Sequence, residues 1–461
     1  MLEMGFATID FTPEPGLVMA GRAKSPPAEG VAGPLCARVL LADDGTQRVA
    51  LVTLDLMALP ATEVDLLRRR LADCGDLLPE NIMIACSHTH AAPLTHLAGL
   101  EQEHNVVQFV DVMSTRIEQA IVMAIRDIQP VELTSARISA PGWVFNRRAV
   151  MADNEVATHG VSWVKGFSRM ETTPDDEVQI LVAKGNDGTV RGGIVGYACH
   201  PTVMESDRLY SSDYAGVLMG ELESTLGGTF CFLLGASGDS ANPDPASPHQ
   251  EEFFGWGYAK TMGRALADRA LEAIGTGRKS TAGRIGIEST ILSISQRRPS
   301  RKQVKLSRWY LEEAPKDIDE AVFLQQLSGH SYTFWEVPSR ASERHAREIL
   351  GMWERQRRAG SRDLVEHMEV QVLVLGDVAI AALPVELFTD LGRDLKQQSP
   401  FPSTFVATMT NGWHGYVPTI EAFERGGYEP LLAYQSRLVP EAGAVLTHAA
   451  LELLHHLYHS R

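Results

Sequence analysis

Short apolar runs alternate along the chain with segments of helical periodicity. Apolar residues recur every three or four positions from Val110 to Ala124 and from Met262 to Ile274, which predicts helices. The pattern predicts an α/β fold in which helices cover a mixed β-sheet core. Runs with the length and β-branched content of covered strands lie at 48–56, 81–86, 192–199, 230–235, 370–384 and 403–409.

The stretch near 300–367 has a different character, because charged residues and strong helix formers dominate it. It predicts a helical excursion that returns to the sheet at Val370. Neither a Gly/Ser-rich or Pro-rich linker nor an internal repeat divides the chain. We expect one domain over 1–461, with sub-regions 1–280 and 281–461.

Composition narrows the function classes. The 58 acidic residues outnumber the 42 basic ones, and the formal charge of -16 disfavours binding to nucleic acid or to an anionic membrane surface. No run of about 18 apolar residues occurs, and the first residues lack the basic start of a secretion signal. We expect a cytoplasmic protein without stable membrane insertion. The cysteines form no CxxC pair, so neither a disulfide framework nor a thiolate zinc finger is indicated.

Histidines stand at the ends of two predicted strands. His88 and His90 follow the run 81–86, and their imidazoles should project together because residues i and i+2 of a strand point to the same side. His200 ends another predicted strand in the same way. Taken alone, such a histidine pair is as well explained by hydrogen bonds to backbone carbonyls at a polar turn. His96 is expected at the surface or behind the other histidines.

Glu386 follows a long apolar run through Pro384, which ends a strand ladder. Imidazole and carboxylate groups are ligands for a catalytic zinc ion, which needs three or four protein groups and one open position. The alternative for Glu386 is a first-turn acid that complements a helix dipole. Asp213 and Asp239 are expected to cap helices or stabilise loops.

With these positions in place, the chain resembles the catalytic domain of the neutral/alkaline non-lysosomal ceramidases. The matching segments occur in order over nearly the whole chain: GFATIDFTP, SHTHAAP, FNRR, CHPTVM, SSDYAG, GASGDSANP, LPVELF and NGWHGYVPTIEAFERGGYEP. The resemblance implies the family's fold and the hydrolysis of an N-acyl amide at one Zn2+ ion per chain. It implies that the metal ligands are His88, His200, Glu386 and Tyr416.

The resemblance also implies catalytic roles. His90 is expected to protonate the leaving amine, and Arg147 and Tyr428 are expected to stabilise the developing oxyanion. Without the resemblance, a surface ion pair for Arg147 and core packing for Tyr428 are the more common explanations.

Departures from the family pattern shape the expected reaction. Ala241 occupies the place of a family serine discussed as a nucleophile, and Ser240 precedes it, which favours metal-activated water over an acyl-enzyme. The family's C-terminal immunoglobulin-like domain and a basic amphipathic helix are not found, and Trp413 and His414 are added near the metal-binding tyrosine. We therefore expect a soluble small or amphiphilic substrate rather than long-chain ceramide.

The sequence thus predicts a zinc-dependent amidohydrolase that acts on a small-molecule N-acyl substrate. One alternative keeps the site and changes the bond, giving a metal-dependent esterase or lactonase. Another alternative is a non-catalytic relative that binds a metal or a ligand. Assembly into a homo-oligomer and the identity of the acyl and amine groups stay open.

Overall fold

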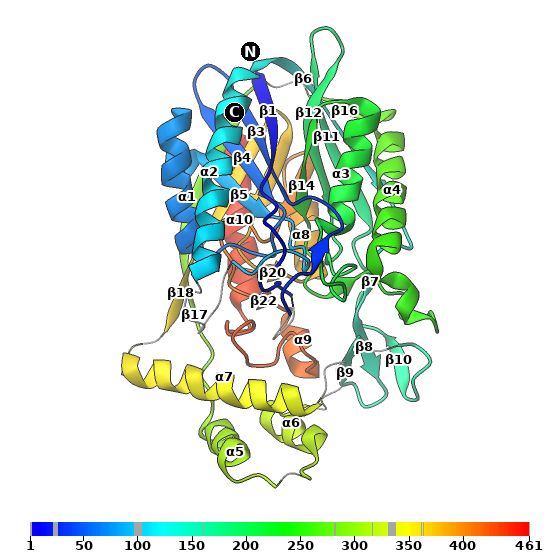
Figure 1. The fold of residues 1–461 in the computed structure, drawn as a ribbon, viewed down its shortest axis with the longest axis vertical. Coiled ribbons are helices and arrows are strands. Elements are labelled where there is room, and N and C mark those ends of the chain that lie inside the picture. The colour runs from blue at the N-terminus through cyan, green and yellow to red at the C-terminus, as the bar shows by residue number, and fades with distance from the viewer. Residues whose placement is uncertain are drawn as a thin grey trace.

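A large and a small β-sheet are stacked face to face, and helices cover the outer face of each sheet (Figure 1). This arrangement confirms the predicted α/β class with a mixed sheet core covered by helices. The computed structural model describes residues 2–21, 26–95, 104–159, 161–280, 283–315, 317–330, 338–360, 362 and 364–460.

The large sheet has the strand order β14-β12-β11-β6-β1-β3-β4-β5, with β16 (Arg278–Lys279) beside β6. The pairs β4–β5 and β12–β14 are parallel, and the other pairs are antiparallel. Alternate residues face opposite sides, so Ala50 and Val52 pack on helices while Val49 and Leu51 pack on the small sheet. Its other strands are β1 (Glu3–Asp10), β3 (Cys36–Asp43), β4 (Arg48–Leu54), β5 (Ile82–Cys86), β6 (Gln129–Ser139), β11 (Glu177–Gly185), β12 (Val190–Tyr197) and β14 (Thr229–Leu234).

The small sheet has the order β17-β18-β19-β21, in which β19 and β21 run parallel. The predicted single strand at 370–384 is two strands, because the chain turns at Gly376, whose φ of 61° lies in the left-handed region. Met83 of the large sheet packs against Ile380 and Phe405 of the small one. The strands are β17 (Ile285–Ser295), β18 (Val365–Leu375), β19 (Val378–Ala382) and β21 (Ser403–Ala407).

Amphipathic helices complete the outer layers. Four of them pack on the large sheet: α1 (Ala61–Gly75), α2 (His104–Arg126), α3 (Asp213–Leu226) and α4 (Gly255–Ile274). The outer face of the small sheet is covered by α8 (Thr389–Gln398) and α10 (Ala442–His459). The helices predicted from Val110 and from Met262 are α2 and α4, and each begins about two turns earlier than its periodicity indicated.

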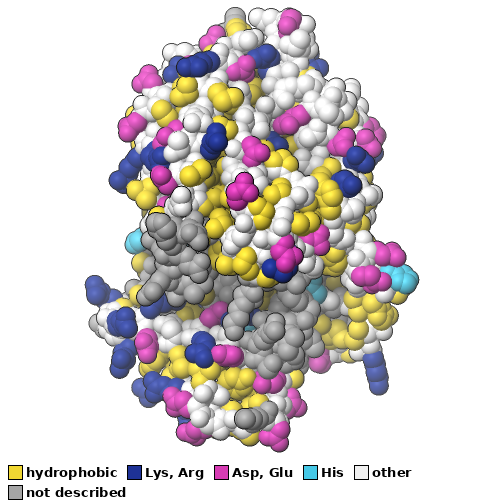
Figure 2. All heavy atoms as spheres, in the orientation of Figure 1, with side chains coloured by type: hydrophobic (Ala, Val, Ile, Leu, Met, Phe, Trp, Pro, Cys, Tyr) yellow, Lys and Arg dark blue, Asp and Glu magenta, His cyan; other side chains and the backbone are white. Residues whose placement is uncertain are grey.

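The predicted helical excursion is confirmed as a separate cluster below the sheets (Figure 1). Val304, Phe323, Leu327 and Ile349 form its core. The chain returns to the sheet at Val365, five residues before the predicted point, because β18 extends beyond its apolar run. Acidic and basic side chains are interspersed over the face in Figure 2. The helices of the excursion are α5 (Arg301–Glu312), α6 (Glu320–Ser328) and α7 (Pro338–Ala359).

Outside the two sheets, short strands form one three-stranded sheet and three pairs among the described residues. The pair that matters most is β20 (Glu386–Leu387) with β22 (Tyr416–Val417). No described helix is long and apolar enough to cross a membrane. The remaining short elements are β2 (Gly30–Val31), β7 (Phe145–Asn146), β8 (Arg148–Met151), β9 (Val156–Thr158), β10 (Phe167–Met170), β13 (Leu209–Tyr210), β15 (Ser240–Ala241), α9 (Ile420–Arg425) and the 3-10 turns Pro79–Asn81 and Gln250–Phe253.

Candidate metal centre

His88 stands in a strained turn directly after β5. Its φ of 66° places a non-glycine residue in the left-handed region, where strain is typical of functional sites. The turn is held because the His88 amide donates to the Leu56 carbonyl at 2.8 Å. The imidazole is buried, and its Nδ1 lies 2.7 Å from the Met57 carbonyl oxygen. This contact directs Nε2 away from the backbone.

His200 follows β12 and is oriented in the same way. Its Nδ1 lies 3.3 Å from the Ser237 carbonyl oxygen, and its amide donates to the Ser240 carbonyl. Burial, the adjacent His88 and Arg147 hold the pKa of His200 well below its usual value, so the ring is neutral near pH 7. His200 therefore presents an uncharged imidazole to the centre of the site.

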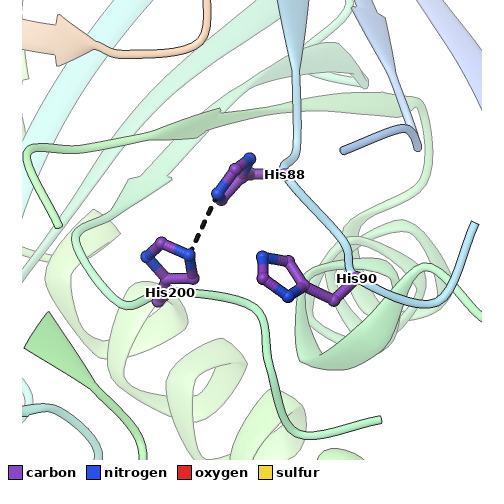
Figure 3. Close-up of side chains that lie close together, drawn as sticks. All are labelled: His88, His90 and His200. Atoms are coloured by element: carbon purple, nitrogen blue, oxygen red, sulfur yellow. Dashed lines mark hydrogen bonds between the residues drawn. The ribbon is translucent and has the colours of Figure 1, made fainter. Parts of the chain in front are cut away.

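The two imidazoles and Glu386 converge on one point. The Nε2 atoms of His88 and His200 lie 3.0 Å apart, and Glu386 Oε2 lies 3.5 Å from the first and 3.8 Å from the second. A carbonyl oxygen only accepts hydrogen bonds, so in the neutral tautomer that donates from Nδ1 each Nε2 offers the lone pair that a metal ion needs. Two ring nitrogens and one carboxylate oxygen thus face one another, and the dashed line in Figure 3 marks the contact between the two Nε2 atoms.

Glu386 is held as a carboxylate at this point. Its Oε1 accepts a hydrogen bond from Trp413 Nε1 at 2.9 Å, whereas its buried Oε2 accepts none from the described residues. Burial would raise its pKa, but His88, Trp413 and Arg147 outweigh burial and bring the pKa down to about 2. A buried anionic oxygen without a donor is costly, and a bound cation removes that cost.

The spacing of these atoms fits a small divalent cation. Ligands about 2.0–2.1 Å from a tetrahedral zinc ion lie about 3.4 Å from one another. The observed separations of 3.0, 3.5 and 3.8 Å bracket that value. Both imidazoles also make the Nδ1 contact to a carbonyl that orients histidine ligands at metal sites. The donor set therefore fits a metal ion.

His90 completes a cluster of imidazoles (Figure 3). Its ligand atom and those of His88 and His200 all lie within 4.8 Å of one another. Neither ring nitrogen of His90 forms a hydrogen bond within the described structure, and Nδ1 is 3.9 Å from Glu205 Oε1. Burial lowers the pKa of His90 despite the neighbouring Glu205. The geometry allows His90 to serve either as a further ligand or as a proton-transfer group.

Tyr416 is brought to the centre by strand pairing. Glu386 and Tyr416 are register partners in the parallel pair β20–β22, so their side chains lie on the same side. The Tyr416 hydroxyl oxygen accepts a hydrogen bond from Arg147 Nη2 at 3.1 Å. Burial and the adjacent Glu386 raise the pKa of Tyr416 well above its usual value. The structure thus links the predicted metal-binding tyrosine to the predicted oxyanion arginine.

Arg147 belongs to a buried arginine–glutamate cluster that also contains Arg148, Glu171 and Glu429. Glu429 is fully buried and accepts from Arg147 Nε at 2.8 Å and from Arg148 Nη1 at 2.6 Å. Arg148 pairs on its other side with Glu171. Burial lowers the pKa of Arg147, but the neighbouring Tyr416 and Glu429 outweigh burial and raise the pKa overall. The guanidinium is fixed and charged.

Tyr428 packs beside Tyr416, with ring centroids 5.7 Å apart at an interplanar angle of 74°. Its hydroxyl oxygen accepts a hydrogen bond from Gln435 Nε2 at 3.3 Å. Burial raises the pKa of Tyr428 to about 12, so the phenol keeps its proton at neutral pH. It can act toward a substrate oxygen as a donor.

Ser240 lies behind the metal centre. Its buried hydroxyl is 2.9 Å from Thr389 Oγ1, which donates to Asp239 Oδ1 at 2.7 Å. Asp239 Oδ1 also accepts the first amide of α8, in agreement with a capping role. No imidazole is among the hydrogen-bond partners of the Ser240 hydroxyl in the described structure. A seryl nucleophile is not supported at this position.

The structure brings together the side chains that the sequence singled out. His88, His90, His200 and Glu386 share one centre, and Tyr416, Arg147 and Tyr428 adjoin it through pairing, hydrogen bonding and ring packing. Their chemical roles stay predictions. His96 lies outside the described residues.

Sequence reasoning missed supporting groups around the centre. Glu429 follows Tyr428 directly, yet nothing in the local pattern marked its link to Arg147. Trp413 was noted as an addition, but its bond to Glu386 was not foreseen. His414, the other addition, contacts Glu366 instead. The available signal for Glu429 and Trp413 was that each lies inside a segment that matches the family pattern.

Comparison with known proteins supports the fold. No family model matches the chain. The crystal structure of neutral ceramidase from Pseudomonas aeruginosa superimposes with a TM-score of 0.69 and 16% identity, covering 98% of this chain and 74% of that one. A ceramidase complexed with C2 gives a TM-score of 0.71 and 16% identity, covering 100% of this chain and 75% of that one. The predicted resemblance is confirmed at the level of the fold.

Proposed function

We propose that this chain is a metal-dependent amidohydrolase that cleaves an N-acyl amide bond with an activated water molecule. The observation that carries the proposal is the convergence of His88 Nε2, His200 Nε2 and Glu386 Oε2 on one point. The similar structures are ceramidases by name, and a ceramidase hydrolyses an amide. A shared fold does not fix the reaction, so the site chemistry carries the argument.

His88, His200 and Glu386 would hold the metal, with Tyr416 as the fourth ligand and Zn2+ as the expected ion. Zn2+ accepts nitrogen and carboxylate ligands in this number, whereas Mg2+ and Ca2+ favour oxygen ligands. Such an ion supplies Lewis acidity and lowers the pKa of water bound to it to about 7.

The remaining side chains would bind and orient the substrate. Arg147, fixed by Glu429 and charged, and the Tyr428 hydroxyl would donate to the oxygen that becomes negative in the transition state. His90 would deliver a proton to the leaving nitrogen. Ser240 has no assigned part, because its hydroxyl is committed to Thr389. We propose a small or amphiphilic N-acyl substrate.

The test combines metal analysis with turnover. Purified protein is assayed for bound metal and then offered a panel of N-acyl amides and the matching esters. The proposal predicts about one Zn2+ per chain and faster hydrolysis of amides than their intrinsic reactivity relative to esters would give. Chelation should abolish the activity, and adding Zn2+ back should restore it. Hydrolysis of esters alone would indicate an esterase or lactonase. Full activity in metal-free protein would exclude the proposed mechanism.

A further inference from the structure

A cavity of about 240 Å³ lies between the helical excursion on one side and α9 with the loop that follows it on the other. We call it the Arg297 pocket. Arg297, Arg298, Gln303 and His330 line one part of it. Phe423 and Leu431 belong to its apolar part. None of the side chains that converge on the metal centre lines this pocket.

The described lining of the Arg297 pocket is basic in a protein whose formal charge is -16. It contains two arginines and a histidine, and none of the described lining residues is acidic. In a protein of net negative charge, a lining without described acidic groups and with Arg297 in it favours an anionic ligand.

Arg297 itself has no counter-ion among the described residues. One nitrogen, Nη2, donates to the Ser436 carbonyl at 2.5 Å and to its hydroxyl at 3.1 Å, while the buried Nε has no acceptor. Burial lowers the pKa of Arg297 to about 10, with no carboxylate near enough to oppose the effect. Arg437, in contrast, is paired with Glu366 at 2.6 Å. A half-buried guanidinium whose Nε is buried without an acceptor is costly, and a bound carboxylate reduces that cost.

The apolar part of the lining indicates that the anion carries a hydrocarbon group. The guanidinium carbon of Arg297 lies 4.9 Å from the centroid of the Phe423 ring, so a carboxylate on Arg297 would sit beside that ring. Pro430, Leu431 and Leu432 extend the apolar surface. The volume is below the 300–1,000 Å³ typical of sites for drug-sized ligands, which limits the ligand to a short chain.

We propose that the Arg297 pocket binds the carboxylate of a short organic acid. The loop 426–432 separates this pocket from the candidate metal centre. Gly426, Gly427 and Pro430 line the pocket, whereas Tyr428 packs on Tyr416 and Glu429 pairs with Arg147. The carboxylate belongs either to a free acid or to the substrate itself. Binding at Arg297 does not depend on the proposed hydrolysis.

The test is calorimetric titration of the full chain with hexanoate and, as a neutral isostere, hexanamide. The titrations are run before and after chelation, because carboxylates also bind metal ions. We expect hexanoate to bind chelated protein at least tenfold more tightly than hexanamide does. Arg297→Gln should weaken the binding of hexanoate at least tenfold. Arg301→Gln, which removes an exposed charge outside the pocket, should change the hexanoate affinity less than twofold.

Equal binding of hexanoate and hexanamide to the chelated wild-type chain would overturn the proposal, and this comparison needs no variant to fold. Hexanoate binding that disappears on chelation and survives Arg297→Gln would also overturn it.

Kinetic measurements then distinguish the two sources of the carboxylate. A KM increase in Arg297→Gln confined to substrates with a distal carboxylate indicates the substrate, whereas hexanoate-dependent turnover of an uncharged substrate indicates a separate acid. If the protein hydrolyses none of the amides or esters, the proposed function fails, but the titration still tests the binding of hexanoate at Arg297.

Discussion

The candidate metal centre and the arginine–glutamate cluster are neighbours, and both are buried, but they use their charged side chains differently. In the cluster, Glu429 accepts from Arg147 and Arg148, and Arg148 also meets Glu171. At the metal centre, two ring nitrogens and one carboxylate oxygen lie within 3.8 Å of one another. The cluster balances its charges with its own side chains, whereas the metal centre offers ligand atoms that a cation would bind.

The difference teaches how each region responds to loss of a side chain. Removing one member of a complete buried ion pair leaves an uncompensated charge, which costs folding free energy. Removing one ligand from the metal centre mainly deletes a contact that, on the proposed function, is made to the metal ion. Metal binding itself adds stability, because the ion binds the folded chain preferentially. Stability and metal content should therefore separate the two regions.

The largest expected effect is that of His88→Ala. Loss of one imidazole should reduce bound metal to less than about a tenth and turnover by about a thousandfold or more, since the Lewis acidity is lost. The unfolding temperature should fall at least to that of chelated wild-type protein, because the hydrogen bond to Met57 is lost as well. Elemental analysis, turnover and thermal unfolding measure the three quantities. His456→Ala, at an exposed imidazole on α10, is the matched control and should change none of them. Wild-type metal content in His88→Ala would remove His88 from the site.

Glu429→Gln should give the converse result. The variant leaves Arg147 and Arg148 without their shared carboxylate, so we expect a loss of about 3–5 kcal/mol in the free energy of unfolding with metal content unchanged. Urea denaturation and elemental analysis provide the measurements. Glu343→Gln, which breaks an exposed pair with Arg347, should cost less than about 1 kcal/mol. Loss of metal at unchanged stability would place Glu429 in the metal centre instead.

Sequence patterns predicted the parts of the site that end long strands. His88 and His200 end apolar runs, and Glu386 follows one, so the strand-end rule applied to each. The contact of Tyr416 with Arg147 depends on the two-residue strands β20 and β22, which are too short to show periodicity.

The stacking of two sheets was not predictable for a related reason. β4 and β19 are apolar on both faces, and a run that is apolar throughout does not reveal whether a helix or a second sheet covers it. The turn at Gly376 inside the long run 370–384 was missed because apolar residues continue on both sides of it. Strands whose periodicity was weak, such as β6, became evident only through their partners.

Tyr428→Phe tests a side chain that lies between the metal centre and the arginine–glutamate cluster and belongs to neither. Metal content should stay at the wild-type level while kcat falls about a hundredfold, as expected for the loss of one oxyanion donor. Burial raises the pKa of Tyr428 to about 12, so Tyr428 should add no ionisation to the pH–rate profile between about pH 6 and 10. Tyr458→Phe, at an exposed ring on α10, is the control. Unchanged turnover on the best amide would remove Tyr428 from the reaction.

Trp413→Phe should have the smallest effect and yet sharpens the comparison most. The indole Nε1 donates to Glu386 Oε1 and so directs Oε2 toward the imidazoles, but the carboxylate itself remains in the variant. Loss of such a supporting donor weakens metal affinity about 10- to 100-fold. Competition with a chelator of known affinity measures the change, and kcat at saturating metal should stay within about threefold of wild type. Trp309→Phe, on the exposed side of α5, should leave metal affinity unchanged. If Trp413→Phe instead bound metal normally and unfolded more easily, the indole would serve packing, and Glu386 would owe its orientation to the β20–β22 pair alone.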